Sequence, residues 1–325
     1  MERILITGAT GQIGTELTPA LRQCYGAEQV VAVGHTKEPA AQFRSDGPYV
    51  SCDVRDKTAL AELVRHHQID TIYHLAALLS ATAEKEPQLA WEVNITGLLN
   101  VLEVARLHGC AIFHPSSIGA FGPDTPRDHT PQMTIQRPET MYGVSKVTGE
   151  LLCDYYYRRY GLDARGVRYP GLISHTALPG GGTTDYAVEI FYAALRDRQY
   201  TCYLEPTTRL DMMYMPDAIR AAIAIMAADP TRLRHRNAYN ITAMSLTPAE
   251  LAAAIRKHLA DFEISYEVDP IRQTIADSWP DQLDDSAARS QWDWAPRYDL
   301  DGMTEDMLAR LSEKLKSIGQ KSVGR

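Results

Sequence analysis

Short apolar runs alternate with longer amphipathic segments through the first half of the chain. Runs such as residues 3–7 are rich in β-branched side chains, which is typical of strands buried on both faces of a parallel sheet. The longer segments place apolar residues at helical spacing. The expected strands are residues 3–7, 29–34, 49–54, 70–77, 111–114 and 162–169, and the expected helices are 15–25, 58–67, 87–108 and 142–160. This alternation predicts an α/β protein with a doubly wound, parallel-sheet Rossmann fold.

The pattern changes after residue 170. A glycine–threonine loop at 179–186 enters a helix that extends to about residue 197. Smaller elements follow at 200–204, 216–226, 238–241, 247–259 and 264–268. We therefore predict a dinucleotide-binding domain over 1–170 and a smaller carboxyl-terminal, mainly substrate-binding region over 171–315, parts of which return to the first domain. Residues 316–325 lack apolar periodicity and are expected to form a mobile tail.

Charge and composition narrow the class of partner. The net charge of -8 and the pI near 5.7 argue against a nucleic-acid-binding surface, which gathers Lys and Arg. No stretch reaches the roughly 18 consecutive apolar residues of a membrane helix. The chain passes from Met1 almost directly into the first expected strand, which leaves no room for a secretory or transit segment. A cytoplasmic protein with a small-molecule ligand is expected.

Cysteine and histidine spacing predicts neither a disulfide framework nor a metal site. The five cysteines are scattered without a CxxC pair, and the ten histidines form neither HxxxH nor HExxH. Reduced and mostly buried thiols are the simplest interpretation.

The first expected strand runs directly into a glycine-rich turn that opens a helix. The spacing is GxxGxxG, a looser form of the dinucleotide fingerprint, in which glycines let the backbone approach a pyrophosphate at a helix amino terminus. The residues expected to hold the dinucleotide here are Gly8, Gly11, Gln12, Ile13 and Gly14.

Further cofactor contacts are expected where the next strands end. An acid normally follows the second strand and accepts from the adenosine ribose, but this chain has Gly34 and His35 there, followed by Thr36 and Lys37. His35 would not repel a 2′-phosphate as a carboxylate would, so the choice between NAD and NADP stays open at this point. Asp53 at the end of the third strand is placed to hold the adenine amino group, and the small residues after the fourth strand would let the ribose lie close. The remaining expected cofactor contacts are Val54, Leu75, Ala76, Ala77, Asn94 and Tyr169.

Tyr142 and Lys146 are one helical turn apart and share a helix face. A free tyrosine has a pKa near 10, so about one in a thousand is phenolate at pH 7. A neighbouring ammonium and an oxidised nicotinamide would both lower that pKa. Ser117 follows a buried strand and is expected at the same sheet edge, where its hydroxyl can hold a substrate oxygen beside the phenol. The three residues together predict removal of a proton and a hydride from an alcohol.

With this trio and the glycine turn in place, the chain resembles the extended short-chain dehydrogenase/reductases. Longer runs resemble the short-chain-type L-threonine 3-dehydrogenases within that superfamily, over about residues 1–312. These runs are AALLSATAE (76–84), RYPGLI (168–173), PGGGTTDYA (179–187), ADSWP (276–280) and DDS (284–286).

The resemblance implies NAD-dependent oxidation of the L-threonine 3-hydroxyl to 2-amino-3-oxobutyrate, which continues to glycine or aminoacetone. It implies Tyr142 as base, Lys146 as the residue that holds the ribose and tunes the phenol, and Ser117 as the residue that positions the alcohol. It further implies a homodimer packed through the helices at 87–108 and 142–160. The substrate-facing motifs of the family fall on Ser80, Gly182, Thr183, Thr184 and Trp279, with the threonine loop placed to take the carboxylate.

Two other functions are compatible with parts of this pattern. A nucleotide-sugar epimerase or dehydratase shares the trio and the cofactor, but it would need room for a nucleoside diphosphate beside the short loop at 180–184. A non-catalytic dinucleotide sensor would retain Ser117, Tyr142 and Lys146 only by accident.

Overall fold

The computed structural model describes residues 1–178, 180 and 182–323. Its centre is a six-stranded parallel sheet in the order β3-β2-β1-β4-β5-β7. The strands are β1 (Ile4–Thr7), β2 (Val30–Gly34), β3 (Tyr49–Ser51), β4 (Thr71–His74), β5 (Ala111–Phe113) and β7 (Ala164–Arg165). The strand order reverses between β1 and β4, as in a doubly wound Rossmann fold, so the predicted fold class is confirmed.

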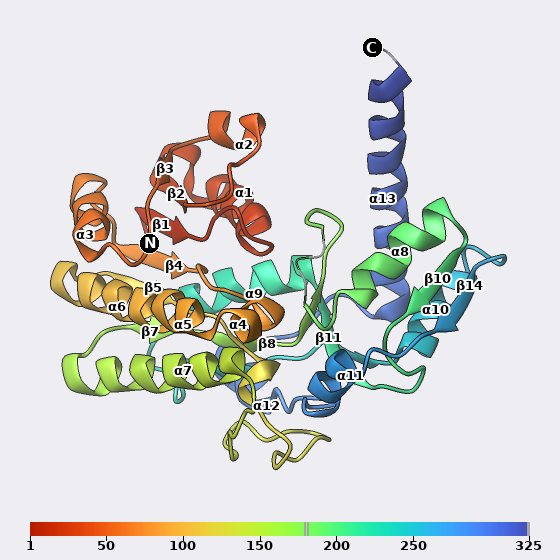
Figure 1. Ribbon diagram of the computed structural model, residues 1–325. Helices are drawn as coiled ribbons and strands as arrows, with labels where there is room; N and C mark the ends of the chain where they lie inside the picture. Colours follow the sequence, from red (N-terminus) through yellow and green to blue (C-terminus); the bar gives the residue numbers. More distant parts are fainter. Residues whose placement is uncertain (179, 181, 324–325) are drawn as a thin grey trace.

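Helices cover both faces of this sheet (Figure 1). One face carries α1 (Gly14–Tyr25) and α9 (Met215–Ala227), and the other carries α3 (Lys57–His66), α6 (Gly97–His108) and α7 (Met141–Tyr160). Alternation along β1 explains the two layers, because Ile4 and Ile6 pack against the first set of helices and Leu5 packs against the second. All three side chains are fully buried, so burial on both faces accounts for the continuous apolar run.

The carboxyl-terminal half adds three small sheets. They are β9 (Gly171–Ile173) with β11 (Leu210–Tyr214) and β13 (Met244–Leu246), β10 (Gln199–Cys202) with β14 (Glu263–Tyr266), and β6 (Ser116–Ser117) with β8 (Val167–Tyr169) and β12 (Tyr239–Asn240). The helices are α8 (Tyr186–Arg196), α10 (Pro248–Arg256), α11 (Pro270–Asp277), α12 (Ser286–Trp292) and α13 (Leu300–Val323). A second core lies among α8, α10 and α13 and includes Phe191, Leu251 and Met307. Thr247 starts α10 with a capping box to Glu250, as its position before Pro248 suggests.

The sequence pattern misplaced several boundaries. The expected strand 162–169 is two strands, because a Cβ at Gly166 would lie 2.1 Å from the His114 carbonyl oxygen and the chain changes sheets there. The expected helix 87–108 follows one path but divides into α5 (Pro87–Ala90), a π-helical segment η2 (Trp91–Thr96) and α6. The pattern also missed several elements, among them η1 (Ala27–Gln29), α2 (Ala41–Ser45), α4 (Ser80–Lys85), η3 (Ile118–Ala120) and the helices α11, α12 and α13.

The carboxyl-terminal segment is helical. Helix α13 continues as far as Val323 and its last turns extend away from the body of the molecule (Figure 1). The remaining two residues of the expected 316–325 tail lie outside the described part of the chain.

Candidate active site

One cavity lies beyond the carboxyl ends of the central strands and is closed on its far side by the smaller region. Its wall includes turns after β1, β4 and β5, the start of α7, and the loop that enters α8. Because parallel strands present their carboxyl ends at one edge, segments far apart in the sequence meet here. The residues expected from sequence that line this cavity are Gln12, Ile13, Leu75, Ala77, Ser80, Ser117, Tyr142, Lys146, Tyr169, Gly182, Thr183, Thr184 and Trp279.

A second cavity continues from the first along the sheet edge, since Leu75 and Ala77 line both. It lies over the ends of β1, β2, β3 and β4. The expected residues that line it are Gly8, Gly11, His35, Asp53, Val54, Leu75, Ala76 and Ala77. Together the two cavities form an elongated site with the trio at one end and His35 and Asp53 at the other.

The glycine turn fits the backbone approach that a dinucleotide requires. Gly8 has a φ of +69°, and a Cβ there would lie 2.6 Å from the Ala76 amide nitrogen. A Cβ on Gly14 would lie 2.4 Å from the Gly8 carbonyl oxygen. Helix α1 starts here with no side-chain cap among the described residues. The Thr15, Glu16 and Leu17 amides donate to backbone carbonyls, whereas those at positions 12–14 have no acceptor among the described residues and are open to an anion. Gly8, Gly11, Gln12 and the start of α1 are therefore suited to the pyrophosphate of NAD.

The expected catalytic trio is brought together at the start of α7. Thr140 caps this helix by accepting from the Gly143 amide at 3.1 Å, so Tyr142 falls in its first turn. The Lys146 ammonium lies 5.4 Å from the centre of the Tyr142 ring and donates to the Pro115 carbonyl at 2.9 Å. Ser117, at the end of β6, accepts from the Gly119 amide at 3.1 Å. The Tyr142 phenol, the Lys146 amine and the Ser117 hydroxyl therefore line the same cavity.

Burial sets the proton affinities of the two ionisable members. It raises the pKa of Tyr142 to about 12, while the nearby Ser117 hydroxyl opposes this. It lowers the pKa of Lys146 to about 8, against the raising effect of the Glu150 carboxylate. The protein alone therefore does not bring the pKa of Tyr142 near 7. Lowering it requires additional positive charge, such as that of a bound oxidised nicotinamide.

A buried ion pair between Glu150 and Arg168 lies next to the site. Glu150, one turn beyond Lys146 on α7, receives two hydrogen bonds from Arg168, with Nη2 to Oε2 at 2.7 Å and Nε to Oε1 at 2.9 Å. Glu150 also accepts from the hydroxyl of Ser116, which precedes Ser117. This pair could not be predicted from local sequence patterns, because its partners lie on different elements.

The loop before α8 provides polar groups opposite the trio. Thr183 is buried in the cavity wall, and the Gly182 amide donates to the Asp185 carboxylate at 2.7 Å. Trp279, from the end of α11, and Ser80, at the start of α4, complete this side. Asp185 also lines the cavity and was not expected, although it directly follows the two threonines that were.

Two expected cofactor residues line neither cavity. Asn94, in the π-helical segment, accepts from the Leu78 amide at 2.7 Å and donates to the Ser145 hydroxyl at 3.2 Å. It therefore ties the end of the β4 loop to α7 from behind. Gly14 packs against the Gly8 carbonyl as described above.

Two buried histidines lie beneath Lys146. The rings of His74 and His114 stack with 5.6 Å between their centroids, and His74 Nδ1 is 2.8 Å from the Thr7 hydroxyl. His74 Nε2 and His114 Nδ1 have no hydrogen-bond partner within the described residues. Burial lowers the pKa of His74 to about 3 and that of His114 well below its ordinary value, and the Lys146 charge adds to both effects.

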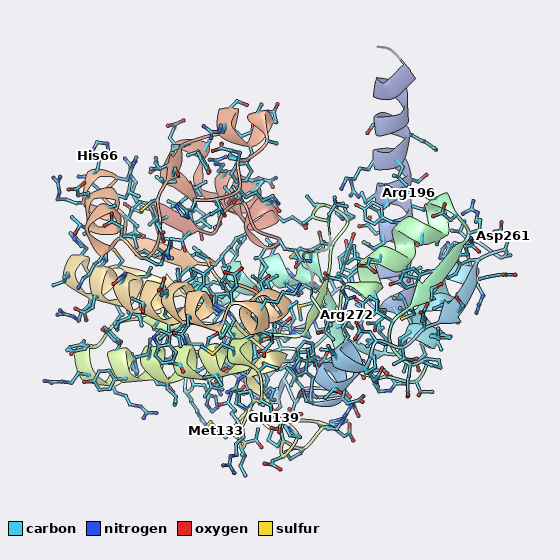
Figure 2. All side chains as sticks on the ribbon, in the orientation of Figure 1. His66, Met133, Glu139, Arg196, Asp261 and Arg272 are labelled. Atoms are coloured by element: carbon cyan, nitrogen blue, oxygen red, sulfur yellow. The ribbon has the colours of Figure 1, made fainter. Side chains whose placement is uncertain are left out.

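We expect this pair to make stability fall in mild acid. The folded protein keeps both rings neutral, whereas the unfolded chain protonates them below about pH 6.5, so stability is lost as pH falls from there. The free energy of unfolding should drop by about 1.4 kcal/mol per pH unit for each histidine. Urea unfolding at pH 7.5 and 5.5 should show a smaller drop for His114→Gln than for wild type. His66→Gln, whose ring lies at the outer edge of α3 (Figure 2), is the control and should retain the wild-type slope. Equal slopes for wild type and His114→Gln would contradict the prediction.

No described helix is both long and apolar enough to cross a membrane. Within the same residues, no cluster of three or more His, Cys, Asp or Glu side chains is arranged to hold a metal ion. Four of the five cysteines are buried, and Cys24 is exposed.

Comparison with solved structures places this chain among proteins of closely similar fold. The L-threonine dehydrogenase of Clostridium difficile is 53% identical with a TM-score of 0.95, over 97% of this chain and 98% of that one. The holo form of the L-threonine dehydrogenase of Cupriavidus necator is 51% identical with a TM-score of 0.92, over 95% and 99%. A monomeric L-threonine 3-dehydrogenase from a metagenome is 46% identical with a TM-score of 0.90, over 95% and 98%.

Sequence comparison agrees with the structural one. An uncharacterised epimerase/dehydratase of Staphylococcus haemolyticus is 54% identical over 314 residues, which cover 97% of this chain and 99% of the relative. The model of the NAD dependent epimerase/dehydratase family matches residues 4–242. Since that model spans most of the chain and the relatives match nearly its whole length, the chain belongs to the NAD-dependent epimerase/dehydratase family and is an NAD-using enzyme.

Proposed function

We propose that this enzyme is an L-threonine 3-dehydrogenase, which oxidises the 3-hydroxyl of L-threonine to give L-2-amino-3-oxobutyrate. The observation that carries the proposal is that the expected catalytic residues and the expected substrate-binding residues line the same cavity. Ser117, Tyr142 and Lys146 line it on one side, and the Thr183–Thr184 pair and Trp279 line it on the other. The L-threonine dehydrogenases that match nearly the whole chain at about half identity support the same substrate.

In this proposal the Tyr142 phenolate accepts the proton of the substrate hydroxyl. The Ser117 hydroxyl holds the substrate oxygen beside the phenol, so that the proton has a short path. Lys146 keeps most of its charge at pH 7 and holds the nicotinamide ribose. Bound NAD supplies the two-electron oxidant and a positive charge that favours the phenolate.

The substrate carboxylate is assigned to the loop before α8. Amides and hydroxyls near a helix start suit an anion, and Gly182, Thr183 and Thr184 provide both. Ser80 and Trp279 limit the size of the amino acid at the remaining walls. The product is a β-keto acid, so it can lose carbon dioxide to give aminoacetone or be cleaved to glycine. A cytoplasmic location stays a prediction.

A cofactor-reduction assay tests the function. Threonine with NAD should increase NADH absorbance, and the rate should rise toward alkaline pH because loss of the Tyr142 proton favours oxidation. UDP-glucose in place of threonine should give no turnover. Absence of signal with threonine would reject the proposal, and epimerisation of the UDP-sugar would favour the nucleotide-sugar alternative.

We also propose a homodimer through η2, α6 and α7. These segments pack side by side (Figure 1). They also expose large apolar side chains. Val144, Leu151 and Tyr155 lie on one face of α7, each at least 40% exposed. Such a stripe on a surface helix is typical of an interface.

Leu151→Glu should convert the dimer to a monomer, because it places a charge in the centre of this stripe. Light scattering after size-exclusion chromatography should give twice the 36.2 kDa chain mass for wild type and the chain mass for the variant. Ile271→Glu, an equally drastic change at an exposed apolar residue of α11, should remain dimeric. A monomeric wild type, like the metagenome relative, would contradict the prediction.

A further inference from the structure

The end of β2 lacks the acid that favours NAD over NADP in Rossmann folds. That acid accepts from the adenosine 2′-hydroxyl and repels a 2′-phosphate. Here β2 ends at Gly34, and a Cβ at this position would lie 2.4 Å from the Tyr49 hydroxyl. The next residue is His35, so neither position presents a carboxylate to the ribose.

Hydrogen-bond donors occupy this end of the site instead. The cavity wall after β2 is formed by His35, Thr36 and Lys37, and Arg55 faces them from the loop after β3. Lys37 is exposed and forms no hydrogen bond or ion pair with any described residue. Its ammonium and the Thr36 hydroxyl are therefore available to a ligand at the cavity edge.

The carboxylates nearby are already paired with arginines. Arg55 donates to Asp53 at 2.7 Å and to Glu92 at 2.9 Å, and Glu38 forms an ion pair with Arg44. His35 Nε2 lies 3.8 Å from the Asp53 carboxylate. These pairings reduce the negative charge that a 2′-phosphate would meet.

We propose that the adenosine end of this site also takes a 2′-phosphorylated dinucleotide, with the phosphate held by His35, Thr36 and Lys37. The same site would then accept NADP as well as NAD. The proposal depends on the dinucleotide site of the family and not on the identity of the substrate.

Calorimetric titration of the full-length protein without substrate tests this directly. The Kd of NADP should lie within about tenfold of that of NAD, a difference of about 1.4 kcal/mol or less. As probes of the adenosine end alone, 2′,5′-ADP should bind more tightly than 5′-AMP. A Kd for NADP more than a thousandfold above that of NAD, or 2′,5′-ADP binding more weakly than 5′-AMP, would overturn the proposal.

Two variants distinguish recognition of the 2′-phosphate from the general affinity for dinucleotides. His35→Asp places an acid one residue past Gly34, at a position that already carries an exposed side chain, and should weaken NADP at least tenfold without weakening NAD. Lys37→Gln should weaken NADP several-fold and leave NAD unchanged. Lys257→Gln, the same charge change in an exposed pair with Asp301, should affect neither. Equal losses for both dinucleotides in His35→Asp and Lys37→Gln would also overturn the proposal. Since no substrate is present, this outcome is independent of whether threonine is oxidised.

Discussion

Replacing Tyr142 with phenylalanine should lower threonine turnover by about 10³-fold or more while NAD still binds. The change removes one hydroxyl and keeps the ring, so the packing of the first turn of α7 against Gly119 is retained. A positioned acid–base group typically contributes about 10²- to 10⁴-fold. Tyr169 also lines the cavity and pairs with Ser117 between β6 and β8, but its hydroxyl donates to the Ala218 carbonyl at 2.7 Å. Asp185 is on the opposite loop, so neither group is placed to replace the Tyr142 phenol.

Both turnover and NAD binding should be measured for this variant. NADH formation should fall to the assay limit, whereas the Kd for NAD from titration should stay within a few-fold of wild type. Tyr155→Phe, the same change at an exposed position of the same helix, should leave both values unchanged. Turnover above a tenth of wild type in Tyr142→Phe would exclude the phenol as base.

The pH profile adds an independent readout of the same group. Burial, opposed by the Ser117 hydroxyl, raises the pKa of Tyr142 to about 12, so the phenolate is scarce near neutral pH unless a positive charge is bound beside it. Wild-type turnover should therefore rise with pH as the phenol loses its proton. Any residual turnover of Tyr142→Phe should lack this rise.

Local sequence signals were sufficient for the cofactor half of the fold. The strand, glycine turn and helix at residues 4–25 follow one another directly, and strands continue to alternate with helices through the rest of this half. The smaller region was harder to predict because β9 and β13 are three-residue strands, too short to display alternation. The break at Gly166 depends on the His114 carbonyl, about fifty positions away, which no local pattern contains.

The candidate site likewise contains residues that could be predicted from the sequence and residues that could not. Motif residues such as Ser117, Tyr142 and Thr183 could be named because each follows a recognisable strand end or opens a helix, and they line one cavity. The residues that support them could not be named. Glu150 and Arg168 satisfy each other across α7 and β8, and Arg168 also donates to Asn240 from β12 at 3.0 Å. Such partners are defined only by the folded chain.

Replacing Arg168 with methionine should cost about 3–5 kcal/mol of unfolding free energy. Both side chains of the Arg168–Glu150 pair are 6% exposed, and their bidentate contact is the main compensation for burying the Glu150 charge. Methionine fills similar volume but leaves that carboxylate in the interior, with Ser116 and Gln136 as its remaining partners. An unpaired buried charge is much more costly than the loss of an exposed pair.

Urea unfolding at pH 7.5 should show the loss, and two controls identify its origin. Arg232→Met breaks the exposed pair with Asp293 and should change stability little. The double change Arg168→Met with Glu150→Met should recover most of the stability, because it removes both charges together. If Arg168→Met were as stable as Arg232→Met, the pair would not support the fold. The double variant also isolates a functional role: Glu150 opposes the fall in the Lys146 pKa, so a folded enzyme without it should lose the Lys146 proton at lower pH and bind NAD more weakly above that point.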